Sequence, residues 1–312
     1  MVAFTSAGKA ETGSAAPDQA SAVLGDCATQ RNLDAQGRAQ SVAIGASFRD
    51  LGIPVSRVLA SPFCRTLETA ALAFGHVQFW RLKEDWLRLS AKRFGHRYLF
   101  DCIVPGGVAV DISDSGRAEL AQETERIEAE VRSLHAIYDE HAGLQDRFAN
   151  AGIVKPELAA RLGLTGLAGR ASAQAWDARA QFPQAPYDQL AVNMATQRNG
   201  DVLARAEVRF AELYESLRLV RELLARLPAG ELHSPLAAVH AVREGLGWVE
   251  GWRGGVVVAL RIGADGRLDR VHPHDPSWQN WPLLEIGTLG NIVPDFPLIN
   301  KSFNLSYSGT DL

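Results

Sequence analysis

Charged side chains are closely spaced in the stretch LTGLAGRASAQAWDAR, residues 164–179. Arg170, Asp177 and Arg179 place two guanidinium groups and a carboxylate in a segment otherwise rich in small residues. Guanidinium groups bind carboxylates through paired, planar hydrogen bonds, so these residues can pair with one another or with an anionic ligand. Two interpretations stay open: a structural ion-pair network, or the edge of a ligand pocket.

A histidine beside an arginine, His96 and Arg97, precedes the turn-forming residues 105–107, Pro-Gly-Gly. The pair could contact a cofactor, or His96 could be a structural histidine between helices. The two glycines predict a turn that needs free backbone angles, where the chain can approach another surface closely.

Histidine and aspartate, both common metal ligands, occur together in HPHD, residues 272–275. Pro273 and Pro276 indicate a rigid turn after a strand. Because no third ligand is evident, the turn is favoured over a metal site.

Composition excludes several classes of protein. The net charge of -4 gives no basic surface for nucleic acid. There is no run of about 18 apolar residues that would cross a bilayer, and the first residues do not resemble a secretory signal. Cys27, Cys64 and Cys102 are scattered and form no CxxC motif, which fits a reducing cytosol better than a disulfide framework.

Hydrophobic spacing indicates the elements that position these groups. We predict that residues 1–25 form a flexible tail. The pattern over residues 26–78 is α/β, with a helix around residues 39–48, a strand at 55–59 and a second helix from near Arg65.

Two long amphipathic helices are expected further along the chain. One has apolar residues at helical spacing over residues 127–138 and would begin at Asp114 or Ser115. The other has the same spacing over residues 213–224 and would begin at Asp201. Their apolar faces could pack on each other as a helical core.

Residues 26–76 resemble a fragment of the histidine phosphatase (phosphoglycerate mutase-like) superfamily, on GRA at 37–39 and on SPFCRTLETA at 61–70. The resemblance implies that Arg65 binds a phosphoryl group. The family's nucleophilic histidine lies upstream of this block, whereas the first histidine of this chain is His76. Without that imidazole no group can accept the phosphoryl group covalently. The alternative function is therefore a histidine-type phosphohydrolase that is expected to be inactive.

A second set of blocks occurs in order along residues 79–312. They are RLKEDWLRL (81–89), GHR with PGG (95–97 and 105–107), LTGLAGRASAQAWDAR (164–179) with Pro186-Tyr187, the 199–224 helix, VEGWRGG (249–255) followed by a β-hairpin over 256–271, and the C-terminal PLINKSFNLSYSGTDL. These blocks resemble the large-subunit superfamily shared by membrane-bound [NiFe] hydrogenases and the 49-kDa subunit of Complex I. The closest resemblance is to large subunits of the formate hydrogenlyase and hydrogenase-4 type.

The resemblance implies a mainly α-helical α+β fold, with a hydrogenase large-subunit-like helical core and a small β-hairpin over residues 79–312. An incomplete α/β fragment over residues 26–78 would precede it. The implied function is that of an oxidoreductase subunit in a membrane-associated NADH-quinone oxidoreductase-like or hydrogenase-4-like electron-transfer complex, linked to NAD and quinone. Its expected partners are an iron–sulfur small subunit and membrane subunits, and its expected location is the cytoplasm, peripheral on the inner face of the cytoplasmic membrane.

The hydrogenase branch of this superfamily binds nickel and iron through four thiolates from two CxxC pairs. This chain has neither pair, and the late family pattern Asp-Pro-Cys-x-x-Cys falls on residues 304–309. Ser306 and Gly309 stand at the two cysteine positions. We therefore expect no [NiFe] centre and no cofactor bound by this chain itself, while quinone stays possible by resemblance.

Overall fold

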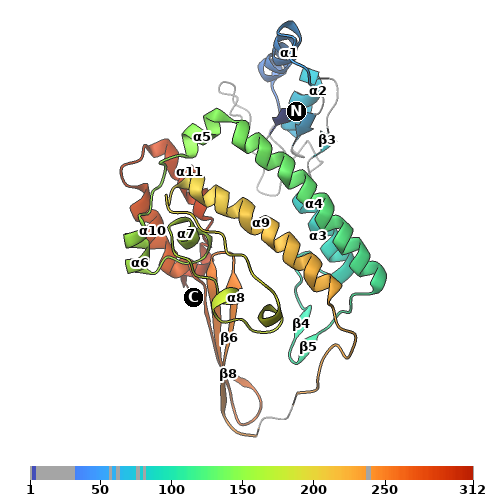
Figure 1. Ribbon diagram of the computed structural model, residues 1–312, viewed down its shortest axis with the longest axis vertical. Coiled ribbons are helices and arrows are strands. Elements are labelled where there is room, and N and C mark those ends of the chain that lie inside the picture. The colour runs from blue at the N-terminus through green and yellow to red at the C-terminus, as the bar shows by residue number, and fades with distance from the viewer. Residues whose placement is uncertain are drawn as a thin grey trace. The chain divides into compact units, whose positions relative to one another are not determined.

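The computed structural model describes residues 2–4, 32–55, 58–60, 64–74, 78–79, 82–236 and 240–311. The chain divides into two compact units, Met1–Lys92 and Arg93–Leu312 (Figure 1). In the described residues helices predominate over small sheets, which agrees with the predicted mainly helical α+β class.

The first unit contains a parallel sheet with the strand order β1-β2-β3. Its elements are β1 (Val2–Phe4), α1 (Ala35–Asp50), β2 (Val58–Ala60), α2 (Cys64–Phe74) and β3 (Gln78–Phe79). The helices predicted at 39–48 and from near Arg65 correspond to α1 and α2, and the strand predicted at 55–59 is displaced to β2. Strand β1 lies within the predicted tail, whose other residues are outside the described part of the chain.

A helix and a small hairpin follow. Helix α3 (Leu82–Phe94) contains most of the RLKEDWLRL block and is followed by the hairpin strands β4 (Ile103–Val104) and β5 (Gly107–Val108). Between these strands Gly106 has a φ of +94°, and the N–H of Ser234 donates to its carbonyl over 3.0 Å. The predicted turn with a close backbone approach is therefore confirmed.

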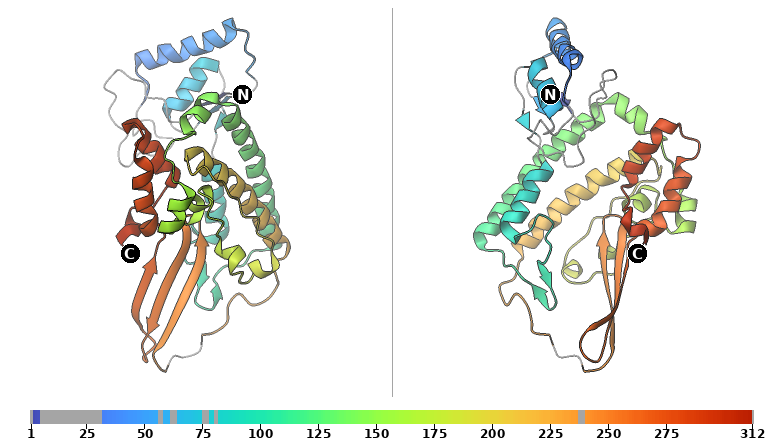
Figure 2. Two further views of the ribbon diagram at one scale, coloured as in Figure 1. Left: turned by 60° about the vertical axis from the view of Figure 1, so that its left-hand side comes forward. Right: turned by 180° about the vertical axis from the view of Figure 1, so that it is seen from behind.

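Two long helices, α4 (Asp114–Glu140) and α9 (Val202–Ala225), lie side by side in all views (Figures 1 and 2). An ion pair of 2.6 Å joins Arg221 of α9 to Glu128 of α4. The predicted cap of α9 is confirmed, because Asp201 Oδ1 accepts the N–H of Ala204. The predicted cap of α4 is wrong: Ser113, in extended conformation, precedes the helix and caps it.

The second unit also contains several short helices, and some of them contribute to its apolar core. They are α5 (Ala142–Phe148), α6 (Pro156–Leu162), α7 (Gly166–Ala171), α8 (Ala178–Gln181), α10 (Ser277–Thr288) and α11 (Phe296–Phe303), with 3-10 helices η2 (Tyr187–Gln189), η3 (Val293–Asp295) and η4 (Ser308–Asp311). Val154, Leu283 and Ile299 are fully buried in this core, together with Phe303 and Leu305 near the C-terminus.

None of the helices in the described part of the chain is long and apolar enough to span a membrane.

An antiparallel sheet completes the second unit, with the strand order β6-β7-β8. The strands are β6 (Arg243–Gly251), β7 (Gly254–Ile262) and β8 (Leu268–His274). The predicted hairpin is β7-β8, and β6 is an additional strand that the hydrophobic pattern did not indicate. The predicted turn at residues 272–275 is wrong, because Pro273 pairs with Val258 within β8, an edge strand that tolerates proline.

Candidate functional site

The three charged residues predicted in the stretch 164–179 lie together. Arg170 belongs to the last turn of α7, Asp177 caps α8, and Arg179 lies within α8. Helix α7 is held tightly at its start, where Gly166 has a φ of +64° and a Cβ atom would lie 2.1 Å from the carbonyl carbon of Arg253. Glycine is therefore needed for α7 to approach the β6–β7 connection.

Arg170 is the centre of an ion-pair network. Its side chain is buried, and its Nε donates to Glu212 Oε1 over 2.5 Å while its Nη1 donates to Glu250 Oε1 over 3.1 Å. Asp177 accepts two hydrogen bonds from the Arg179 side chain, of 3.0 Å from Nε and 2.7 Å from Nη2. Asp177 Oδ2 also lies 3.9 Å from Arg170 Nη1, which joins the two pairs.

The network residues other than Asp177 border a cavity of about 340 Å³, called here the charged cavity. Its lining residues are Arg170, Arg179, Arg209, Glu212, Leu213, Ser216, Glu250, Gly251 and Trp252. All three predicted residues thus belong to an ion-pair network, and Arg170 and Arg179 also line a cavity, while ligand binding there stays a prediction.

The two buried carboxyl groups of the network differ electrostatically. Burial raises the pKa of Glu250, and the negative charge of Asp177 acts in the same direction, against the hydrogen bonds from Ala178 and Arg170. Burial acts on Asp177 as well, but the hydrogen bonds from Arg179 outweigh it and hold the pKa of Asp177 below its usual range. Glu250 is thus the group that accepts a proton more readily, while Asp177 keeps its charge.

A further cationic group, Arg209, lines the same cavity. Burial lowers the pKa of Arg209 to about 10, so its guanidinium is charged at neutral pH. The guanidinium of Arg209 packs over the ring of Trp252, with its carbon atom 4.8 Å from the ring centroid. The arrangement can hold an anionic or hydrogen-bonding ligand against Arg179 and Arg209, and can exchange a proton at Glu250.

Three charged members of the cavity were missed from the sequence: Arg209, Glu212 and Glu250. Glu250 lies two residues after Trp248, which places the two side chains on the same face once β6 is known to be a strand. Trp248 stacks on Trp176 with ring centroids 5.5 Å apart, next to the network. The two α9 residues have no local signal.

His96 and Arg97 do not line the charged cavity. They lie in the loop after α3, where His96 Nδ1 accepts the N–H of Tyr98 over 3.1 Å. The His96 ring stacks on Phe100 with centroids 4.5 Å apart, and Arg97 is exposed. His96 therefore organises its own loop and does not lie between helices. Arg65 lies in α2, and its side chain is outside the described part of the structure.

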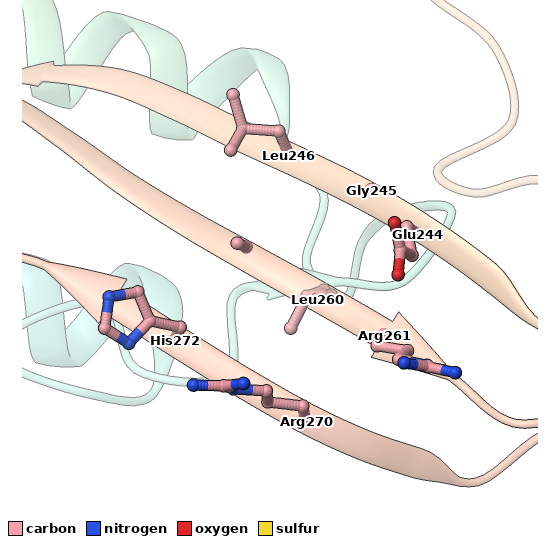
Figure 3. Close-up of a pocket in the computed structure, with 8 residues that line it drawn as sticks. Glu244, Gly245, Leu246, Leu260, Arg261, Arg270 and His272 are labelled. Atoms are coloured by element: carbon pink, nitrogen blue, oxygen red, sulfur yellow. The ribbon is translucent and has the colours of Figure 1, made fainter.

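The two histidines of residues 272–275 do not converge on one point. His272 lines an open depression of about 580 Å³ on the β6-β7-β8 sheet, with Glu244, Arg261 and Arg270 (Figure 3). His274 Nε2 instead lies 3.0 Å from Gln279 Oε1. The interpretation of this stretch as a metal site gains no support.

Ser306 and Gly309, the two positions where the resemblance predicted cysteines, do not fit a thiolate centre. Ser306 Oγ accepts the N–H of Gly309 over 3.0 Å, and the N–H of Ser306 donates to Ser277 Oγ over 2.9 Å. A Cβ atom on Gly309 would lie 2.8 to 3.0 Å from atoms of Asp275. A hydroxyl already engaged in a turn and a glycine packed against a carboxylate supply no soft ligand.

Comparison with known proteins identifies the family. A family described as respiratory-chain NADH dehydrogenase, 49 Kd subunit, matches residues 73–247, more than half of the chain. The chain belongs to this family. The predicted superfamily is thereby confirmed for the later part of the sequence.

Curated relatives of this 49 Kd subunit family member include hydrogenase and NADH-quinone oxidoreductase subunits. It is 30% identical to the carbon monoxide-induced hydrogenase of Rhodospirillum rubrum over 70% of this chain and 61% of that protein. It is 29% identical to formate hydrogenlyase subunit 5 of Escherichia coli (strain K12) over 76% of this chain and 42% of that protein. It is 30% identical to NADH-quinone oxidoreductase subunit 4 of Thermus thermophilus over 48% of this chain and 36% of that protein. The chain thus spans less than two thirds of these relatives.

A solved structure has the same fold. A chain of the membrane-bound sulfane sulfur reductase, an archaeal respiratory membrane complex, matches with a TM-score of 0.69 at 22% identity, over 89% of this chain and 73% of that one. Nothing in these comparisons supports the resemblance of residues 26–76 to histidine phosphatases.

Proposed function

We propose that this chain is a subunit of a membrane-associated electron-transfer complex of the NADH-quinone oxidoreductase or hydrogenase-4 type. The family match over residues 73–247 carries the proposal. The names of the relatives support it, because formate hydrogenlyase subunit 5 and hydrogenase-4 component G are parts of multi-component systems. In this proposal the chain binds an iron–sulfur small subunit and membrane subunits, and it is peripheral on the inner face of the cytoplasmic membrane.

The chain itself carries no [NiFe] centre in this proposal. The geometry at Ser306 and Gly309 supports this, since neither position offers a thiolate and Asp275 occupies the space beside Gly309. Electrons would then pass through the clusters of the small subunit. Quinone is the redox ligand that the resemblance implies for the assembled complex.

Purification from the native membrane tests the assembly. The tagged chain is extracted with a mild detergent, and its partners are identified by mass spectrometry beside an untagged control. We expect stoichiometric recovery of a small subunit with iron–sulfur signals in electron paramagnetic resonance, together with integral membrane subunits. Recovery of the chain alone, without either class of partner, would contradict the proposal.

Metal analysis of the same preparation tests the absence of the [NiFe] centre separately. We expect iron in the amount that the small subunit's clusters require, and nickel only at background. Stoichiometric nickel that stays with this chain after dissociation of the complex would overturn this part of the proposal, while leaving the assembly intact.

A further inference from the structure

Three potential metal ligands converge on the seam between α4 and α9, outside the charged cavity. His135 and Asp139 lie one helical turn apart on α4, and Glu207 projects from α9. One ligand atom from each side chain can be chosen so that all three lie within 4.8 Å of one another, and no other such group occurs in the described part of the chain. We propose that His135, Asp139 and Glu207 bind a divalent transition-metal ion of the zinc class.

The spacing of the ligand atoms is close to what such an ion needs. His135 Nε2 lies 3.7 Å from Asp139 Oδ1 and 3.6 Å from Glu207 Oε2. Bonds of about 2.0–2.1 Å in a tetrahedral site separate neighbouring ligand atoms by about 3.3–3.4 Å. The two distances from His135 are thus within a few tenths of an ångström of this spacing, and the two carboxylate oxygens lie within 4.8 Å of each other, so side-chain rotation can bring the ligand atoms together.

The histidine is held in the orientation that a ligand requires. Its Nδ1 lies 3.2 Å from the Tyr214 hydroxyl, and its ring stacks on Phe210 with centroids 4.0 Å apart and planes 9° apart. A proton on Nδ1 that is donated to the phenol oxygen leaves the lone pair of Nε2 directed toward the two carboxylates. That arrangement gathers three electron-rich atoms that a cation can bridge.

The ligand set defines the kind of ion. One imidazole nitrogen and two carboxylate oxygens suit Zn²⁺ and its neighbours in the first transition row, and a dication neutralises the two carboxylates. The side chains of His135, Asp139 and Glu207 are 25%, 57% and 31% exposed, so an ion can enter from solvent and keep a water molecule as a fourth ligand. The competing occupant is a proton on His135, which would pair with both carboxylates.

Isothermal titration calorimetry of the complete chain with Zn²⁺ tests the site. The protein carries a tag without histidine, because a polyhistidine tag would itself bind zinc. We expect a single ion per chain, and Co²⁺ in its place should give the visible spectrum of a low-coordinate site. Absence of Zn²⁺ binding by the wild-type chain would overturn the proposal.

Variants assign the ion to these ligands. Asp139→Asn should weaken Zn²⁺ binding at least tenfold, whereas Glu140→Gln, the adjacent exposed carboxylate on α4, should leave it unchanged. Tyr214→Phe, which removes only the hydrogen bond to His135, should weaken binding about 10–100-fold. Circular dichroism checks that each variant is folded. Undiminished binding in both Asp139→Asn and His135→Ala would place the ion elsewhere and refute the proposal.

Discussion

Arg205 holds the C-terminal segment of the second unit, and its replacement by methionine should loosen that segment. This α9 side chain is completely buried and donates to Ser302 Oγ over 2.8 Å, to Gly200 O over 2.7 Å and to Gly152 O over 3.0 Å. Its guanidinium also lies 4.3 Å from the ring centroid of Phe303. Burial lowers the pKa of Arg205 to about 9, so it is still charged at neutral pH.

The size of the effect follows from these contacts. Arg205→Met leaves three buried acceptors without their donor, and each unsatisfied group costs about 1–3 kcal/mol. Methionine recovers part of this, because it keeps apolar volume and carries no charge that must be desolvated. We therefore expect a net loss of about 3–5 kcal/mol, as for other buried charges whose network is broken. At about 2–4 °C per kcal/mol for a unit of this size, melting should fall by about 6–20 °C.

Hydrogen exchange with mass spectrometry locates the loss. Because the chain has two units, a single melting temperature does not report one two-state transition. Peptides from α11 (Phe296–Phe303) and from residues 150–154 should lose protection in Arg205→Met, while peptides from α1 should keep it. Arg161→Met, at an exposed position of α6, is the matched control and should change neither.

Two outcomes would refute this reasoning. If Arg205→Met lowers the melting temperature no more than Arg161→Met does, the three hydrogen bonds contribute little to stability. If α11 keeps its protection while other regions lose theirs, Arg205 does not anchor the C-terminal segment. Arg205→Lys should fall between wild type and Arg205→Met, because an ammonium group retains the charge but not the planar fork.

Two further predictions concern the charged cavity and the helix that leads to it. Asp177→Asn should have a lower melting temperature than wild type at neutral pH. The difference in melting temperature should shrink as the pH falls through the lowered pKa of Asp177, because stability from a carboxylate with a depressed pKa is lost on protonation. A difference that is constant with pH would contradict this. Gly163→Ala, at a φ of +68° with open space around it, should cost about 1–2 kcal/mol, whereas Gly166→Ala should cost clearly more, because its Cβ atom would strike backbone. Equal losses in chemical denaturation would show that α7 can shift freely.

Local signals predicted the long helices well. The apolar spacing along α4 and α9 and the cap at Asp201 depend on neighbours three or four residues away, which the sequence shows directly. The cap of α4 was assigned to the wrong residue because Ser113, Asp114 and Ser115 are all residue types that favour the N-cap position. The structure selects Ser113, whose hydroxyl oxygen accepts the N–H of Gly116.

Strand β6 could not be predicted from its own residues. Its sequence REGLGWVEG contains three glycines, and most of its positions are exposed, so the usual alternation is absent. The strand exists because it pairs with β7 along its whole length, from Arg243 to Gly251. Pro273 was misread for a related reason, since proline breaks interior strands but is accommodated at an edge.

The charged cavity illustrates the same limit. Arg170, Asp177 and Arg179 lie within one short stretch, so their meeting was predictable. Their partners are distant in sequence: Glu212 is 42 residues from Arg170, and Glu250 is 80 residues from it. Only the folding of α9 and β6 onto α7 brings these carboxylates to the guanidinium.

The C-terminal segment shows how a position can stay buried without metal ligands. Asn304 ends α11 in a left-handed conformation, and Arg253 Nε donates to its carbonyl over 2.6 Å, while Arg209 donates to the carbonyl of Ser302. Cations at the C-terminal end of a helix are favoured by its dipole, so these arginines can hold the C-terminal segment in place. Arg209 also lines the charged cavity. One side chain thus connects the two features, because Arg209 both donates to the carbonyl of Ser302 and lines the charged cavity.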